Sequence, residues 1–188
     1  MSLFDLRGRT ALVTGGSRGL GLQLAHALGE AGARIMLSSR KAADLEEAAA
    51  ELQAAGIDTR WIAADCGREE DIRRLADETL QRMGQVDILV NNAGAAWGAP
   101  FDEFPESGWD KVVDLNMKAP FFLTQALHGM LTASAAGALV PASPVPAHAM
   151  WYAINLYFKN GGGRCYIVSV GNESAQLAKA PFEKGLEA

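Results

Sequence analysis

The feature that most constrains this chain is a glycine-rich turn within residues 10–21, between an apolar run and a helical pattern. Residues 11–13 read Ala-Leu-Val and predict a buried strand, and apolar residues at helical spacing accompany the glycines Gly15, Gly19 and Gly21. A strand, a glycine turn and a helix direct free backbone N–H groups and the positive end of a helix dipole at one point. We therefore expect the turn to hold an acceptor-rich anion such as a pyrophosphate. An ordinary strand-to-helix connection is the alternative, and it accounts less well for three glycines.

Strands and helices alternate after this turn. Further strands are predicted at 34–38, 58–63 and 86–90, and helices at 42–55, 69–83 and 107–133. Ser107 is expected to cap the last of these helices, and Pro120 to kink or interrupt it. Strict alternation predicts right-handed crossovers and an α/β fold, a Rossmann-like, doubly wound parallel sheet with helices on both faces.

The alternation fails after Ala133. Composition predicts a loop at 134–149, a short helix at 148–158, a fifth strand at 164–170, and a weak helix or frayed end beyond it. We expect one dinucleotide-binding domain over residues 1–188, with a divergent tail from 134 to 188 and a sheet that is incomplete on its C-terminal side.

Composition excludes several classes of function. The chain has 188 residues, is 49% hydrophobic and carries a formal charge of −5, which favours one domain with a core and argues against a nucleic-acid partner. Cys66 and Cys165 form no metal or redox motif, and the N-terminus lacks a secretion signal, so we expect no metal site and a cytoplasmic location. An uncharged window at 119–158 includes Pro141, Pro144 and Pro146, so a membrane span, which needs about 20 mostly apolar residues, is not expected.

Four motifs occur in a fixed order: Thr14-Gly15-x-x-x-Gly19-x-Gly21, then Asp65, then Asn91-Asn92-Ala93-Gly94, then Asn116. This combination resembles the short-chain dehydrogenase/reductase family, from about Leu6 to Ala133. The resemblance implies a nicotinamide nucleotide as cofactor and a small carbonyl or alcohol as substrate. The cofactor-binding residues it implies are Thr14, Gly15, Ser17, Arg18, Gly19, Leu20, Gly21, Ser39, Arg40, Asp65, Cys66, Asn91, Ala93 and Gly94.

Arg40 bears on the choice of cofactor. A site for NAD places a carboxylate about 20 residues after the glycine turn, on the ribose 2′-hydroxyl. Here that region reads Ser38-Ser39-Arg40, and a guanidinium can pair with a 2′-phosphate instead. In the family a base before the middle glycine supports the same choice, and Arg18 stands there. We therefore expect NADP(H) rather than NAD(H), the alternative being two solvated surface arginines.

Three polar residues each have a family role and a plain structural alternative. By resemblance, Asp65 holds the adenine amino group, although an Asp after a strand also caps helices. Asn91 lines the adenosine side and braces the sheet, or simply forms a turn. Asn116 kinks its helix and holds a water of a proton relay, or faces solvent.

The catalytic pattern of the family is broken. Its members use Ser, Tyr and Lys, with Tyr-x-x-x-Lys on one helix face, to deliver a proton to the developing alkoxide. Each Tyr here, at 152, 157 and 166, is followed four residues later by Leu, Gly or Val. Ser169 is the candidate for the catalytic Ser, with a strand-end turn as the alternative.

Three functions remain open at this stage. The first is an NADP(H)-dependent oxidoreductase that transfers hydride between nicotinamide and a carbonyl or secondary alcohol. The second is a catalytically inactive nucleotide-binding or interaction protein, and the third a non-functional fragment. A truncated or altered family member, with an inserted segment from about 135 to 163, is preferred to a genuine variant with a rebuilt site. An incomplete sheet also predicts self-association through its exposed edge.

Overall fold

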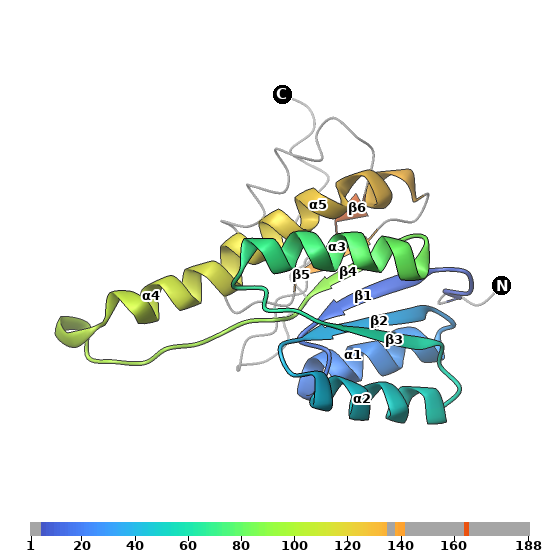
Figure 1. The fold of residues 1–188 in the computed structure, drawn as a ribbon, viewed down its shortest axis with the longest axis horizontal. Helices are drawn as coiled ribbons and strands as arrows, with labels where there is room; N and C mark the ends of the chain where they lie inside the picture. The colour runs from blue at the N-terminus through green and yellow to red at the C-terminus, as the bar shows by residue number, and fades with distance from the viewer. Residues whose placement is uncertain (1–4, 135–137, 142–163, 166–188) are drawn as a thin grey trace, which may run out of the picture.

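A parallel sheet with helices on both faces forms the computed structural model, which describes residues 5–134, 138–141 and 164–165 (Figure 1). The sheet order is β3-β2-β1-β4-β5-β6, and every pairing is parallel. The strands are β1 Thr10–Thr14, β2 Arg34–Ser39, β3 Thr59–Ala63, β4 Ile88–Asn91, β5 Ala138–Pro141 and β6 Arg164–Cys165. The predicted doubly wound α/β fold is confirmed, and the strand order reverses between β1 and β4.

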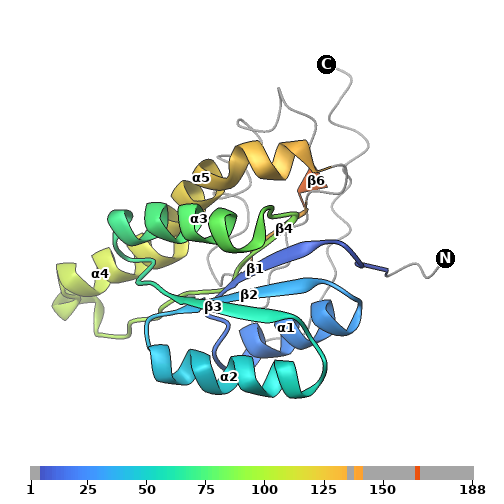
Figure 2. The ribbon, with the colours of Figure 1, turned by 45° about the vertical axis from the view of Figure 1, so that its right-hand side comes forward.

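Two helical layers cover this sheet. Helices α1 (Gly19–Glu30) and α2 (Ala42–Ala54) lie on one face, and α3 (Glu69–Met83) and α5 (Ala119–Ala133) on the other (Figures 1 and 2). Successive residues of β1 pack alternately against the two helical layers, because side chains alternate across a strand. Leu12 belongs to the core under α3 and α5, whereas Ala11 and Val13 belong to the core above α1 and α2. Burial on both faces explains the continuous apolar runs of the sequence.

The region predicted as one helix from 107 to 133 is three segments. Helix α4 (Glu106–Val113) leads into a π-helical stretch, η2 (Asp114–Lys118), and then into α5. The expected interruption is confirmed, and Pro120 lies in the first turn of α5, directly after the π-helical stretch. The expectation for Ser107 is wrong: the helix begins at Glu106 after Pro105, whose fixed φ suits a helix entry, and no side chain caps it. Helix α4, preceded by the short 3₁₀ helix η1 (Phe101–Glu103), projects beyond the sheet (Figures 1 and 2).

The C-terminal expectations are partly wrong. The loop predicted at 134–149 contains strand β5, which pairs with β4 in the register Ile88↔Ala138. The apolar run 138–140 supplies that strand, and the surrounding small residues and prolines concealed it. The strand predicted at 164–170 starts where expected but is the sixth, pairing with β5 over Arg164–Cys165. Ser169 and the helices expected at 148–158 and after 170 lie outside the described residues, and the single-domain expectation stays a prediction.

A buried carboxylate joins three elements at the N-terminal edge of the sheet. Asp87 is 3% exposed, and its Oδ1 accepts hydrogen bonds from Arg9 Nη1 (3.1 Å) and Ser134 Oγ (2.6 Å). Its Oδ2 accepts from the Thr10 backbone N–H (2.9 Å) and from Gln85 Nε2 (2.7 Å). Burial alone would raise the pKa of Asp87, but these four hydrogen bonds outweigh it and lower the pKa below its usual value. The carboxylate therefore ties the start of β1 and the approach to β4 to the end of α5.

Candidate nucleotide-binding site

The glycine turn follows β1 directly and opens α1, as the sequence predicts. Gly15 and Gly19 adopt φ values of 64° and 56°, in the left-handed region that favours glycine. A Cβ on Gly21 would lie 2.3 Å from the Gly15 carbonyl oxygen and 2.5 Å from Asn92 Nδ2. Gly21, in the first turn of α1, therefore has to lack a side chain for the helix to approach the glycine turn this closely.

The start of α1 has the polarity that an anion needs. Arg18 occupies the N-cap position with extended backbone, no side chain caps the helix, and its first turn carries no acidic residue. The first N–H groups of the helix are therefore free of side-chain acceptors, and the helix dipole is positive at this end. The side chains of Arg18 and Leu20 are exposed beside them.

The turn is braced by the loop that follows β4. The Asn92 side-chain amide donates to the carbonyl oxygens of Thr14 (3.0 Å) and Gly15 (3.1 Å). The Thr14 hydroxyl in turn accepts from the backbone N–H groups of Asn92 (3.0 Å) and Ala93 (3.1 Å), and donates to the Val90 carbonyl (3.2 Å). The sequence analysis does not include Asn92 among the site residues. The only available signal was its position next to Asn91 in the Asn-Asn pair.

The C-terminal end of β2 presents hydroxyl groups without partners. Ser38 Oγ and Ser39 Oγ are both buried and have no hydrogen-bond partner among the described residues. The Ser38 carbonyl is bonded to the Gly16 N–H (3.1 Å), so this strand end lies against the glycine turn. Arg40 follows with an exposed side chain. The exposed Arg40 guanidinium beside an open helix start is a group suited to a phosphate ester.

Asp65 and Cys66 follow β3 and differ in what they can offer. Asp65 Oδ1 accepts the Gly67 N–H (3.0 Å) in a local turn, and the cap position of α3 is taken by Arg68. The Cys66 thiol packs in the core under α3, where burial, with the charges of Asp65 and Asp71, raises its pKa to about 12. Only the backbone of Cys66 can therefore face a ligand.

Asn116 lies in η2 and is 1% exposed. Its Oδ1 accepts the Ala95 N–H (2.9 Å) and its Nδ2 donates to the Ala95 carbonyl (2.7 Å). A Cβ on Gly94 would lie 2.8 Å from this Oδ1, so the loop needs a glycine there. The solvent-facing alternative is wrong, since the side chain holds the loop after β4, and its role in a proton relay stays a prediction.

Asn91 is also buried, with its Nδ2 3.5 Å from Thr124 Oγ1 of α5. The structure thus brings the glycine turn, the end of β2 and the loops after β3 and β4 to one edge of the sheet. Ligands bind in such sheets at that edge, where the strand order reverses. Ser169 is outside the described residues, and within those residues no group of three His, Cys, Asp or Glu side chains could hold a metal ion.

Residues 9–158 match the family model described as short chain dehydrogenase. The chain belongs to the short-chain dehydrogenase/reductase family. The family assignment made from the sequence motifs is thereby confirmed.

Individual relatives agree with the assignment. The rhamnolipids biosynthesis 3-oxoacyl-[acyl-carrier-protein] reductase of Pseudomonas aeruginosa is 46% identical over 132 residues, covering 70% of this chain and 51% of that protein. The solved RhlG/NADP active-site complex of P. aeruginosa superposes with a TM-score of 0.72 at 42% identity, covering 76% of this chain and 57% of that one. A metagenomic short-chain oxidoreductase in complex with NADP gives a TM-score of 0.82 at 29% identity, over 89% of this chain and 84% of that one.

This member of the short-chain dehydrogenase/reductase family spans about half the length of the curated relatives it matches. In the part of the chain that the structure describes, no helix is long and apolar enough to cross a membrane.

Proposed function

We propose that this chain is an NADP(H)-dependent oxidoreductase that transfers hydride between the nicotinamide and a small carbonyl or secondary alcohol. The observation that carries the proposal is the glycine turn, held open by Gly21 and braced by Asn92, at the start of a helix with no acidic residue in its first turn. Diphosphate recognition needs this combination of bare backbone and helix dipole.

The preference for NADP(H) rests on the end of β2. Position 39 carries a serine and position 40 an arginine, so no carboxylate stands there to repel a 2′-phosphate. Two solved relatives are complexes with NADP, which supports the same choice.

A nucleotide bound in this way would supply the hydride, and groups of this chain would hold the nucleotide in position. The N–H groups at the start of α1 would hold the diphosphate, Arg40 the 2′-phosphate, and the backbone after β4 the adenosine side. Asp65 retains one carboxylate oxygen beyond the bond to Gly67, and we assign it to the adenine amino group. We assign Asn116 to the relay and Ser169 to the substrate carbonyl, as the family resemblance implies.

A second candidate is a nucleotide-binding protein without turnover. The observation that favours it is the sequence itself, since no tyrosine among the 188 residues is followed four positions later by lysine. Without that pair, the proton for the alkoxide must come from another acid.

A nucleotide titration tests the proposal. Calorimetry should show micromolar binding of NADPH and weaker binding of NADH. Arg40→Asp should weaken NADPH by roughly 10- to 100-fold, about 1.4–3 kcal/mol, because it replaces a charge-assisted contact with repulsion, and should leave NADH nearly unchanged. Arg73→Asp is the matched control, since Arg73 lies on the exposed side of α3, where it pairs with Glu69.

The outcomes separate the candidates. Equal effects of Arg40→Asp on both nucleotides would show that the 2′-phosphate assignment is wrong. NADPH binding without oxidation of the cofactor, across a panel of ketones and aldehydes, would favour the second candidate. Absence of binding to either nucleotide would refute both.

A further inference from the structure

Strand β3 is an edge strand of the sheet and pairs with β2 along one side. The Ile35 N–H bonds the Asp58 carbonyl, and the Ala64 N–H bonds the Ser39 carbonyl, so even-numbered residues of this stretch face β2. Backbone groups alternate direction along a strand, and the N–H and C=O groups of Thr59, Trp61 and Ala63 therefore point outward. Such a row is a template for another strand.

All three outward carbonyl groups are occupied by side chains of the flanking helices. The Thr59 carbonyl accepts from Gln53 Nε2 of α2 at 2.8 Å. The Trp61 carbonyl accepts from Arg82 Nη1 at 3.2 Å, and the Ala63 carbonyl from Arg74 Nη2 at 2.8 Å, both from α3. One side-chain donor thus meets the carbonyl of every second residue of the strand.

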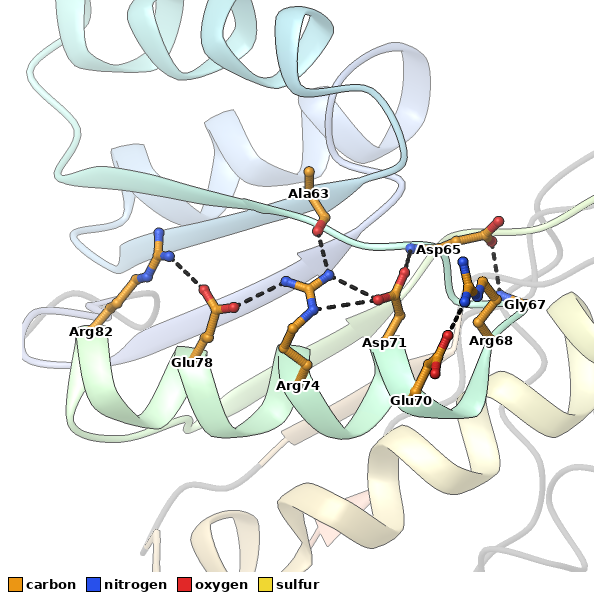
Figure 3. A network of polar contacts seen from close by, with 9 residues as sticks. All are labelled: Ala63, Asp65, Gly67, Arg68, Glu70, Asp71, Arg74, Glu78 and Arg82. Atoms are coloured by element: carbon orange, nitrogen blue, oxygen red, sulfur yellow. Dashed lines mark hydrogen bonds and ion pairs between the residues drawn. The ribbon is translucent and has the colours of Figure 1, made fainter.

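Acidic residues on α3 hold the two arginines in place. Arg74 lies between Asp71 and Glu78, at 3.0 Å from each, and points at the Ala63 carbonyl (Figure 3). Glu78 also binds Arg82 Nη2 at 2.5 Å, so the two guanidinium groups share one carboxylate (Figure 3). Fixing long side chains costs conformational entropy, which normally opposes such contacts. Here that cost is shared among several ion pairs and hydrogen bonds.

The outward N–H groups of Trp61 and Ala63 have no acceptor among the described residues. An incoming strand would find donors on this edge but no free acceptor, and pairing of strands requires both. We propose that Gln53, Arg74 and Arg82 act as a substitute strand that closes the β3 edge against pairing with a second copy of this chain. Any self-association of the protein must then use another surface, and removal of the two arginines opens this edge. This inference does not depend on nucleotide binding.

The test is the double variant Arg74→Met/Arg82→Met, which keeps the helical side-chain length and removes the donors. Relative to wild type, light scattering after size exclusion should show a concentration-dependent increase in mass. Exchange of the Trp61 and Ala63 amide hydrogens should slow by about tenfold or more, because the new partner protects them. Arg73→Met, which removes an arginine that does not reach β3, is the control and should leave both measurements unchanged.

Adding Ala63→Pro to the double variant should restore the wild-type mass, since proline removes an outward donor without touching the ladder to β2. Unchanged mass and unchanged exchange in a folded double variant would refute the proposal. Should the double variant fail to fold, Arg82→Met alone uncovers the central carbonyl, and the same two measurements apply. Protection of the Trp61 and Ala63 amides in the wild-type protein would also refute the proposal, because it would show that the edge is already paired.

Discussion

Gly21 shows how the absence of one side chain shapes the glycine turn. The Cα of this residue is close enough to the glycine turn that a methyl group would overlap the Gly15 carbonyl and the amide of Asn92. The same close approach lets Asn92 hold the start of the turn through the carbonyls of Thr14 and Gly15.

Substitution of Gly21 by alanine should therefore disrupt the turn and its brace together. We expect a loss of about 1–3 kcal/mol in the free energy of unfolding, as for other overpacked sites, and loss of NADPH binding. Urea unfolding and calorimetry measure the two effects. Gly129→Ala is the control, because nothing lies within 4 Å of a Cβ at that helical position and alanine favours the helix. NADPH affinity equal to wild type in Gly21→Ala would contradict this account.

At this scale the sequence predicts residue types better than it predicts contacts. The glycine spacing located the turn, because only glycine tolerates such backbone, and the positive φ of Gly15 and Gly19 agrees. The amide of Asn92 was not assigned, since its partner carbonyls come from the other end of the domain's sequence and no local pattern marks them. The sequence resemblance assigns both Asp65 and Cys66 to the cofactor site, yet only the fold reveals that the Cys66 thiol faces the core.

At the scale of elements, the π-helical stretch η2 holds the loop after β4. It carries the buried Asn116 whose amide closes two hydrogen bonds with the backbone of Ala95. π-helical turns concentrate at functional sites.

Asn116→Ala should release this loop. Loss of two buried hydrogen bonds should cost about 1–3 kcal/mol in the free energy of unfolding, and the Ala95 amide hydrogen, which Asn116 now covers, should exchange faster. Native-state hydrogen exchange measures the second effect directly. Met117→Ala is the matched control, since Met117 belongs to the same stretch and is 38% exposed. Unchanged exchange at Ala95 would show that the loop is held by something else.

The elements themselves divide into those that periodicity reveals and those that it does not. Strands β1 to β4 and helices α1 to α3 follow from apolar runs and helical spacing, since both faces of the sheet are covered. Strand β5 was missed because its three apolar residues lie among small residues and prolines that are typical of loops. Pro120 predicted an interruption of its helix, but it could not specify that the turn before it would be π-helical.

At the scale of the whole molecule, Asp87 links the start of β1 to the end of α5. Its two oxygen atoms face four donors, from Arg9, Thr10, Gln85 and Ser134. An asparagine there would place an NH₂ group against donors, which cannot be satisfied.

Stability should consequently depend on the charge of Asp87. Because its pKa is lower in the folded protein than the value of about 4 in an unfolded chain, its contribution is fully present above that value and is lost as the pH falls through the folded pKa. Asp87→Asn should cost about 1–3 kcal/mol at pH 7, and the difference from wild type should shrink below about pH 4. Urea unfolding at several pH values measures this. Asp77→Asn, at an exposed position of α3, is the control, and a difference that does not change with pH would contradict the assignment.

The brace between Asn92 and Gly15 spans 77 residues of sequence. A chain emerging from the ribosome displays the glycine turn long before the asparagine that steadies it has been added. If the proposed nucleotide binding holds, a dinucleotide in solution should not stabilise the growing polypeptide until translation has passed the loop after β4. We therefore expect any such stabilisation of nascent chains to begin at a threshold length, which the loop after β4 sets rather than the glycine turn itself.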